Sequence, residues 1–272
     1  QFLSAASRAS ASVWIGGITA NAAEASRVRG ANDRVQLSLV GAGGRGTELA
    51  GMFSQRNDCD IAYVCDLHPG RRMAAIKSVA SKSGKEPRPL RELSEALALK
   101  DLDGVIIATQ DHWHALGTIR ACQAGKHVYV EKPPSHTIWE GRKMVEAARK
   151  YNRVVQVGTQ TRSAPYAIAA RDYIQSGKLG AVHLVKVFNL KPGTSFKAPA
   201  DDPCPEGFDW NTWLGPTVSR PHNSGLLNGN WHRYWAYCGG DMADDGIHQV
   251  PAKLATTVGE ALRVSLRFGI EQ

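Results

Sequence analysis

A glycine-rich hexapeptide is the part of the chain whose residue types and spacing point most directly to chemistry. Residues 41–46 follow an apolar run at residues 35–40, and Asp66 comes twenty residues after Gly46. A GxGxxG motif between a strand and a helix, with an acid at this distance, is typical of dinucleotide binding. Gly41 permits the tight turn, Gly43 lets a pyrophosphate approach the backbone, and Gly46 lets helix and strand pack closely. A glycine-rich turn that binds nothing is the alternative.

A Glu-Lys-Pro turn supplies the second candidate group. Lys132 follows the apolar run at residues 127–130, and Pro133 stiffens the turn that carries it. A partly desolvated lysine at the end of a parallel strand could act on a hydroxyl or carbonyl of a substrate. The alternative is an ordinary solvated turn.

An aspartate and a histidine form the third candidate group. Asp244 and His248 are four residues apart after a Gly-Gly pair, so on a helix they share one face. A carboxylate beside an imidazole orients it and raises its basicity, and histidine suits proton transfer near neutral pH. A capped helix start with a satisfied histidine is the alternative.

Alternating elements must position these groups. Short apolar runs predict strands at residues 35–40, 60–65, 104–108, 127–130 and 154–157. Helices are expected between them, at residues 45–55, 70–81, 90–99, 112–124 and 138–150, with Asp111 capping the start of one and Gly125 ending it. The pattern predicts an α/β fold with a doubly wound parallel sheet, which binds ligands beyond the carboxyl ends of its strands.

The pattern changes after about residue 159. A helix is expected at residues 164–175, an alternating half-buried strand at 181–190 and one more strand at 264–268. Residues 191–240 are rich in Pro, Gly, Asn and Trp and show little periodicity, which predicts a long functional loop.

Composition excludes several classes. The net charge is +8, but the basic residues are scattered, so we expect no nucleic-acid partner. The five cysteines have no metal-ligand spacing, and His112 and His114 with Asp111 lack a third well-placed ligand, so we expect no metal. No apolar run is long enough for a membrane span.

The first 34 residues resemble an export signal. An apolar stretch at residues 11–20 precedes an Ala-Asn-Ala sequence of the kind that signal peptidases cleave, and the opening Gln-Phe-Leu-Ser is similar to the residues after the arginine pair of a twin-arginine signal. We therefore expect a periplasmic or exported protein. A disordered tail of a cytoplasmic protein is the alternative.

Taken together, the glycine motif with Asp66, the Glu-Lys-Pro turn and the Asp-x-x-x-His pair resemble the glucose–fructose oxidoreductase / inositol dehydrogenase (Gfo/Idh/MocA) family. Residues 109–114 (Thr-Gln-Asp-His-Trp-His) and 209–216 (Asp-Trp-Asn-Thr-Trp-Leu-Gly-Pro) resemble its exported bacterial branch. The resemblance covers residues 35–250. It implies an NAD(P)-dependent oxidoreductase that acts on a sugar or polyol.

The resemblance also implies a domain plan. After the signal-like residues 1–34, a Rossmann domain spans residues 35–158. Residues 159–272 form an α+β domain with a mainly antiparallel sheet, shortened relative to the family, through which a homo-oligomer would form. Pro251, three residues after His248, departs from the family pattern, because it must kink or end the helix there.

Site residues are implied by the same resemblance. Lys132 would steady the developing alkoxide, His248 would be the general acid/base, and Asp244 would be its partner. Asp66 would bind the ribose diol and favour NAD, whereas Arg71 and Arg72 could hold the 2′-phosphate of NADP. The expected cofactor contacts are Gly41, Gly43, Gly44, Arg45, Gly46, Asp66, Arg71, Thr109, His112, His114, Glu131 and Lys132.

Two other functions stay open at this point. One is a glycosidase of the same fold, which uses tightly held NAD without net redox change. The other is a non-catalytic protein that binds the cofactor. The Glu131-Lys132-Pro133 turn favours the oxidoreductase.

Overall fold

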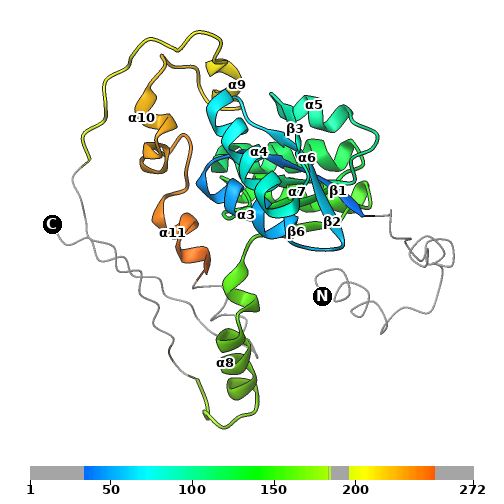
Figure 1. Cartoon of the computed structure of the whole chain (residues 1–272). Coiled ribbons are helices and arrows are strands. Elements are labelled where there is room, and N and C mark those ends of the chain that lie inside the picture. Colours follow the sequence, from blue (N-terminus) through cyan, green and yellow to red (C-terminus); the bar gives the residue numbers. More distant parts are fainter. Residues whose placement is uncertain (1–33, 183, 185–195, 249–272) are drawn as a thin grey trace. The chain divides into compact units, whose positions relative to one another are not determined.

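The computed structural model describes residues 34–182, 184 and 196–248. Its central element is a six-stranded, wholly parallel sheet in the order β3-β2-β1-β4-β5-β6 (Figure 1). The strands are β1 (Val35–Val40), β2 (Cys59–Cys65), β3 (Arg88–Leu90), β4 (Gly104–Ile107), β5 (His127–Val130) and β6 (Val155–Val157). This is the strand order of the Rossmann fold, so the expected α/β doubly wound sheet is confirmed.

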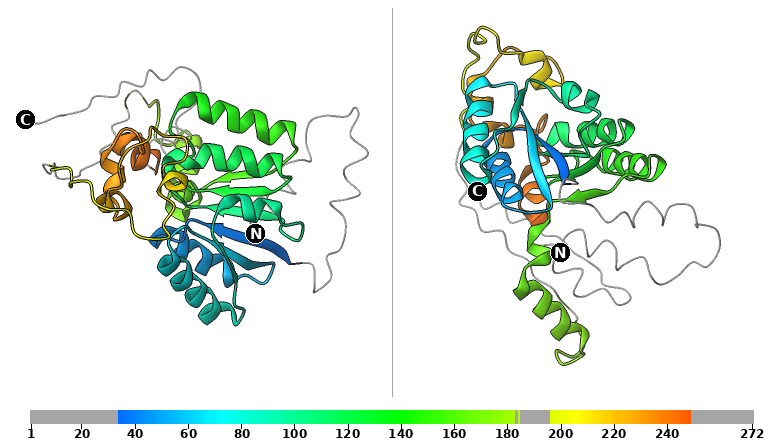
Figure 2. Two further views of the ribbon diagram at one scale, coloured as in Figure 1. Left: turned by 90° about the horizontal axis from the view of Figure 1, so that it is seen from above. Right: turned by 45° about the vertical axis from the view of Figure 1, so that its right-hand side comes forward.

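Helices cover both faces of the sheet, as Figures 1 and 2 show. They are α3 (Gly44–Ser54), α4 (Pro69–Ser83), α5 (Leu93–Ala98), α6 (Asp111–Gln123) and α7 (Ile138–Lys150). Successive strand residues point to opposite faces, which makes two cores. Leu39 and Ile106 pack with α3 and α4 on one face. Val105 and Ile107 pack with α5, α6 and α7 on the other, so the continuously apolar strands are explained by burial on both sides.

Most predicted boundaries agree with the structure to within a residue or two. Gly125 ends α6 as expected: its φ is 77°, and its N–H donates to the Cys122 carbonyl at 3.0 Å. Two expectations are wrong. Asp111 does not cap α6, because Gln110 occupies the N-cap position and Asp111 is the buried first residue of the helix. The helix expected at 90–99 begins only at Leu93.

Short helices occupy much of the described part after residue 159. They are η1 (Gln160–Ser163), α8 (Pro165–Gln175), α9 (Trp210–Leu214), α10 (Ser224–Leu227), η2 (Asn230–Arg233) and α11 (Gly240–Asp244). Residues 196–240, expected as a loop, therefore contain helical turns. A small aromatic core holds them, in which Trp210 and Trp213 stack with ring centroids 4.6 Å apart.

Several expectations lie outside the described residues. They include the signal-like residues 1–33, the core of the strand at 181–190, the strand at 264–268 and Pro251, so export, the antiparallel sheet and the oligomer stay predictions. By internal contacts the chain divides into two units, Gln1–Arg34 and Val35–Gln272. No helix in the described ranges has the length and apolar character needed to cross a bilayer.

Candidate active site

The glycine-rich loop leads into an open helix N-terminus. Gly43 is the N-cap of α3, with no side-chain cap and no acid in the first turn, so the backbone N–H groups there are left for a ligand. A Cβ on Gly43 or Gly44 would meet nothing within 4 Å, so both glycines border open space. By contrast, a Cβ on Gly46 would lie 1.9 Å from the Gly41 carbonyl oxygen. The loop therefore fits a phosphate group on one side and its own backbone on the other.

Asp66 fastens this loop to the end of β2. Its Oδ2 accepts a hydrogen bond from the Ala42 N–H at 2.7 Å, and its Oδ1 accepts one from the His68 N–H at 2.7 Å. Both carboxylate oxygens thus have a backbone donor before any ligand binds. The side chain still borders the cavity, as a ribose-binding acid must.

The two arginines after Asp66 bind backbone carbonyls. Arg71 donates from Nη2 to the Leu227 carbonyl at 2.6 Å, and Arg72 donates from Nη1 to the Asp66 carbonyl at 2.5 Å. Arg71 also lines the cavity. The Arg71 bond joins helix α4 to the segment 196–248.

Arg45 and Glu131 form a partly buried ion pair. Nε and Nη2 of Arg45 each lie 3.0 Å from Glu131 Oε1, while Nη1 lies 2.9 Å from Glu48. Glu131 is 4% exposed, and its other oxygen accepts the Lys132 N–H at 3.1 Å. Arg45, in the first turn of α3, therefore connects the glycine-rich loop to the Glu-Lys-Pro turn and stabilises that turn.

Lys132 and Asp244 meet although 112 positions separate them in sequence. The Lys132 Nζ lies 2.5 Å from Asp244 Oδ1 and also donates to the Asp244 carbonyl at 3.1 Å. The other oxygen of Asp244 lies 3.5 Å from His232 Nδ1. The structure thus joins two of the predicted catalytic residues directly, and His232 was missed because no motif marks it.

His248 is placed differently from the sequence-based expectation of an Asp244–His248 pair. Its N–H donates to the Asp245 carbonyl at 3.0 Å, and its Nδ1 is shielded and has no hydrogen-bond partner among the described residues. Burial, with the Lys132 charge in addition, lowers the pKa of His248. Its catalytic role stays a prediction.

His114 joins the ends of two strands. Its Nδ1 lies 2.6 Å from the Pro133 carbonyl and its Nε2 lies 3.1 Å from the Thr109 carbonyl. The ring is 1% exposed, and this burial lowers its pKa. His114 and Thr109 therefore fix the turn that carries Lys132.

His112 and Trp113 bind the segment 196–248. His112 Nε2 and Trp113 Nε1 lie 3.2 and 3.0 Å from the same Trp213 carbonyl oxygen. Burial lowers the pKa of His112 to about 4, so this imidazole is neutral at physiological pH. Its contacts make His112 a link between the two parts of the chain.

Asp111 is a site residue that the sequence motifs did not identify as one. It is 1% exposed, and burial raises its pKa to about 7. Asp244 adds to this rise, whereas Cys238 and Lys132 oppose it. Its position at a helix start suggested a cap, and only the fold shows that it is buried beside the catalytic candidates.

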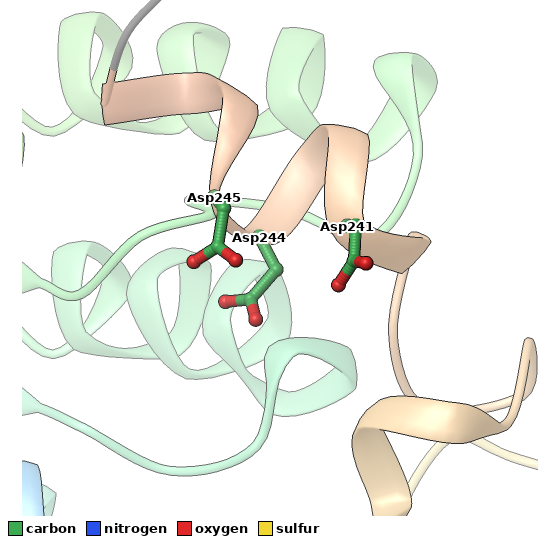
Figure 3. Close-up of side chains that lie close together, drawn as sticks. All are labelled: Asp241, Asp244 and Asp245. Carbon is green, nitrogen blue, oxygen red and sulfur yellow. The ribbon is translucent and has the colours of Figure 1, made fainter. Parts of the chain in front are cut away.

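Three aspartates lie close together at α11. Asp241, Asp244 and Asp245 each offer an oxygen within 4.8 Å of the others, and Figure 3 shows their side chains projecting to the same side. Asp244 already pairs with Lys132, and Asp241 is exposed. The cluster therefore gives no separate reason to place a metal there.

One cavity of about 830 Å³ brings most of these groups together. It lies beyond the carboxyl ends of β1, β2, β4 and β5, and its volume is within the range of ligand-binding pockets. The predicted site residues Gly46, His112 and His248 are not among the described residues that line it. The predicted site residues that do line it are Gly41, Gly43, Gly44, Arg45, Asp66, Arg71, Thr109, His114, Glu131, Lys132 and Asp244.

Family models match both parts of the chain. Residues 35–159 match "Oxidoreductase family, NAD-binding Rossmann fold", and residues 182–255 match "Oxidoreductase family, C-terminal alpha/beta domain", both of the Gfo/Idh/MocA family. The chain belongs to this family. The resemblance of the motifs to the family is therefore confirmed, and so is the NAD-binding Rossmann fold as the setting of the glycine loop, whereas the resemblance to the exported branch stays a prediction.

Relatives within the Gfo/Idh/MocA family are distant. The chain is 28% identical over 158 residues to the D-glucoside 3-dehydrogenase of Escherichia coli, a match that covers 58% of this chain and 44% of the relative. It is 28% identical over 197 residues to the rhizopine catabolism protein MocA of Rhizobium meliloti, covering 70% and 59%. The chain thus spans about half the length of the curated relatives it matches.

A solved structure of another dehydrogenase has the same fold. The WlbA dehydrogenase of Bordetella pertussis, crystallised with NADH and UDP-GlcNAcA, matches with a TM-score of 0.62 and 23% identity over 85% of this chain and 57% of that one. At this identity the match supports the fold alone.

Proposed function

We propose that this chain binds NAD(P) and transfers a hydride between the nicotinamide and a hydroxyl or carbonyl group of a sugar or polyol. The observation that carries the proposal is one cavity that contains both the open N-terminus of α3 and the Lys132–Asp244 pair. Relatives named as inositol and glucoside dehydrogenases support the class of substrate. The bound nicotinamide would supply the hydride acceptor or donor.

The chain's own residues supply charge and proton handling. Asp244 holds the Lys132 ammonium just beyond the carboxyl end of β5. There the ammonium can stabilise a substrate oxygen that gains negative charge. We assign His248 to proton transfer on the family motif alone, since it is not among the described residues that line the cavity. Its Nδ1 has no partner in the described structure and the pKa of the ring is lowered, so the ring is in the neutral form that accepts a proton.

We further propose that NAD is preferred over NADP. Asp66 borders the cavity at the end of β2, where its negative charge would repel a 2′-phosphate. Arg71 and Arg72, which could offset this repulsion, already donate to the Leu227 and Asp66 carbonyls.

A substrate panel tests the proposal. The protein is incubated with sugars and polyols and with NAD or NADP, and the absorbance of reduced nicotinamide is followed. Net reduction with at least one polyol supports the oxidoreductase. Release of sugar from a glycoside without net reduction would instead support the glycosidase alternative.

A matched pair of variants tests the assignment of Lys132. Lys132→Ala should lower turnover by about 100-fold or more while the cofactor Kd stays within a few-fold. Lys143→Ala is the control, because Lys143 pairs with Glu146 on the exposed surface of α7. Turnover of Lys132→Ala close to that of the control would refute a catalytic role of Lys132. Cofactor binding by the wild type without turnover of any sugar or polyol would instead favour a non-catalytic cofactor-binding protein.

A further inference from the structure

Asp111 is a buried acid whose hydrogen bonds are incomplete. It opens α6 directly beyond β4, is 1% exposed and lines the cavity. The Cys238 thiol is near enough to lower the pKa of its carboxyl. Its Oδ2 is shielded from solvent and has no hydrogen-bond partner among the described residues. Since buried polar atoms are almost always paired, this oxygen is arranged for a proton or a ligand.

If the carboxyl groups of Asp111 and Asp244 were both ionised, their two negative charges would exceed the positive charge nearby. The groups that interact with Asp111 are Lys132 from the β5–α7 turn, Asp244 from α11 and Cys238. Lys132 is the one cation in this set, and it is bound to Asp244 at 2.5 Å. Two carboxylates beside one ammonium favour protonation of the more buried one. The pKa of Asp111, raised to about 7 mainly by burial, agrees with this balance.

Topology places Asp111 at the nicotinamide half of the cavity, an inference that rests on the proposed function. A pyrophosphate at the N-terminus of α3 has β2 on one side and β4 on the other. Asp66, at the end of β2, marks the ribose of the adenosine. The other half of the dinucleotide then faces the ends of β4 and β5, which carry Asp111 and Lys132.

We propose that Asp111 is a proton site coupled to the redox state of the cofactor. It holds a proton while the cavity is empty or contains the reduced cofactor, and it releases this proton to solvent when the oxidised cofactor binds. The physical reason is charge: the oxidised nicotinamide ring is a cation and the reduced ring is neutral, and a cation close to a carboxyl favours its ionised form. By linkage, ionised Asp111 strengthens binding of the oxidised cofactor by the same factor.

The experiment measures the Kd of NAD and of NADH as a function of pH in the wild-type protein and in Asp111→Asn. For the wild type, we expect the Kd of NAD to fall about tenfold from roughly pH 5 to roughly pH 8, which corresponds to a pKa shift of about one unit on binding, while the Kd of NADH stays flat. In Asp111→Asn both should be flat, because the amide does not titrate. Asp172→Asn, an exposed acid on α8, is the control and should keep the wild-type slope.

Proton release gives a second readout that needs no variant. In weakly buffered solution with a pH indicator near pH 7, NAD should release a fraction of a proton on binding and NADH none. Equal release with both cofactors, or a wild-type slope in Asp111→Asn, would overturn the coupling. If neither NAD nor NADP binds at any pH, the proposed function fails and the coupling with it, whereas binding without a difference in pH dependence removes the coupling alone.

Discussion

Two alanine substitutions in the glycine-rich loop separate cofactor binding from folding. A Cβ on Gly43 meets nothing within 4 Å, and the backbone there, with φ of −69° and ψ of −175°, is open to any residue. A Cβ on Gly46 lies 1.9 Å from the Gly41 carbonyl oxygen, a backbone atom that cannot move aside freely. Gly43→Ala should therefore keep the stability of the wild type, and Gly46→Ala should be less stable.

The expected magnitudes follow from these contacts. Forcing a methyl group into an occupied space costs roughly 1–3 kcal/mol. For Gly46→Ala the cost falls on the folded protein and lowers its urea midpoint. For Gly43→Ala it falls on the complex, so the NAD Kd should rise roughly 5- to 150-fold while the free energy of unfolding changes by no more than about 1 kcal/mol.

Titration calorimetry with NAD and urea unfolding of both variants form the assay. Unchanged NAD affinity in Gly43→Ala would refute the placement of a phosphate against this backbone. A large loss of stability in the same variant would show that the space beside Gly43 is needed by the protein itself.

Three other predictions concern side chains around the cavity. The folded pKa of Asp111 is about 7 and its ordinary value is 3.8, so the folded state binds an extra proton between these values and its stability falls as pH rises through this range. The free energy of unfolding of Asp111→Asn should therefore rise by about 3 kcal/mol relative to that of the wild type between roughly pH 5 and roughly pH 8. This amount is about two pH units, from roughly pH 5 to the folded pKa, at about 1.4 kcal/mol each. If urea titrations gave the same difference in unfolding free energy between the two proteins at both pH values, this prediction would be contradicted. Glu131→Gln should lower the urea midpoint by an amount equivalent to about 1–3 kcal/mol, because Arg45 loses the buried one of its two charged acceptors. An unchanged midpoint would show that Glu48 and solvent satisfy Arg45 equally well. Asp66→Ser should shift the ratio of the NAD and NADP dissociation constants at least about tenfold toward NADP. Loss of the hydrogen bond to Ala42 lowers the affinity for both cofactors alike, so it does not change this ratio. An unshifted ratio would therefore count against the role proposed for Asp66.

The Rossmann part could be predicted from the sequence because its local signals agree. The strands at 35–40 and 127–130 and the helix at 138–150 have the predicted bounds. In α7 the Thr137 hydroxyl accepts the Glu140 N–H while the Glu140 carboxylate accepts the Thr137 N–H, a capping box that marks the helix start locally. The short edge strand β3 was missed, because it contains Pro89 and two of its three residues are exposed.

The site was less predictable because its contacts are distant in sequence. Lys132 and Asp244 are 112 positions apart. No local sequence pattern predicts whether Asp244 will bind Lys132 or His248. For Asp111 the sequence signature of a cap and that of a buried acid are the same at the start of a helix. Only the burial of its side chain in the folded protein separates the two.

The ion pair between Lys132 and Asp244 divides the reactive centre between two stretches of chain that fold around different cores. The first stretch alone carries the glycine loop and Asp66, so it has the groups needed to hold a nucleotide but leaves its ammonium group without a counter-charge. On the proposed function, catalysis would require the second stretch to dock, through the Trp213 and Leu227 carbonyls that His112, Trp113 and Arg71 bind. A molecule in which only the first stretch is folded would then bind the cofactor without catalysing the reaction. Turnover would therefore report that both stretches are folded and docked.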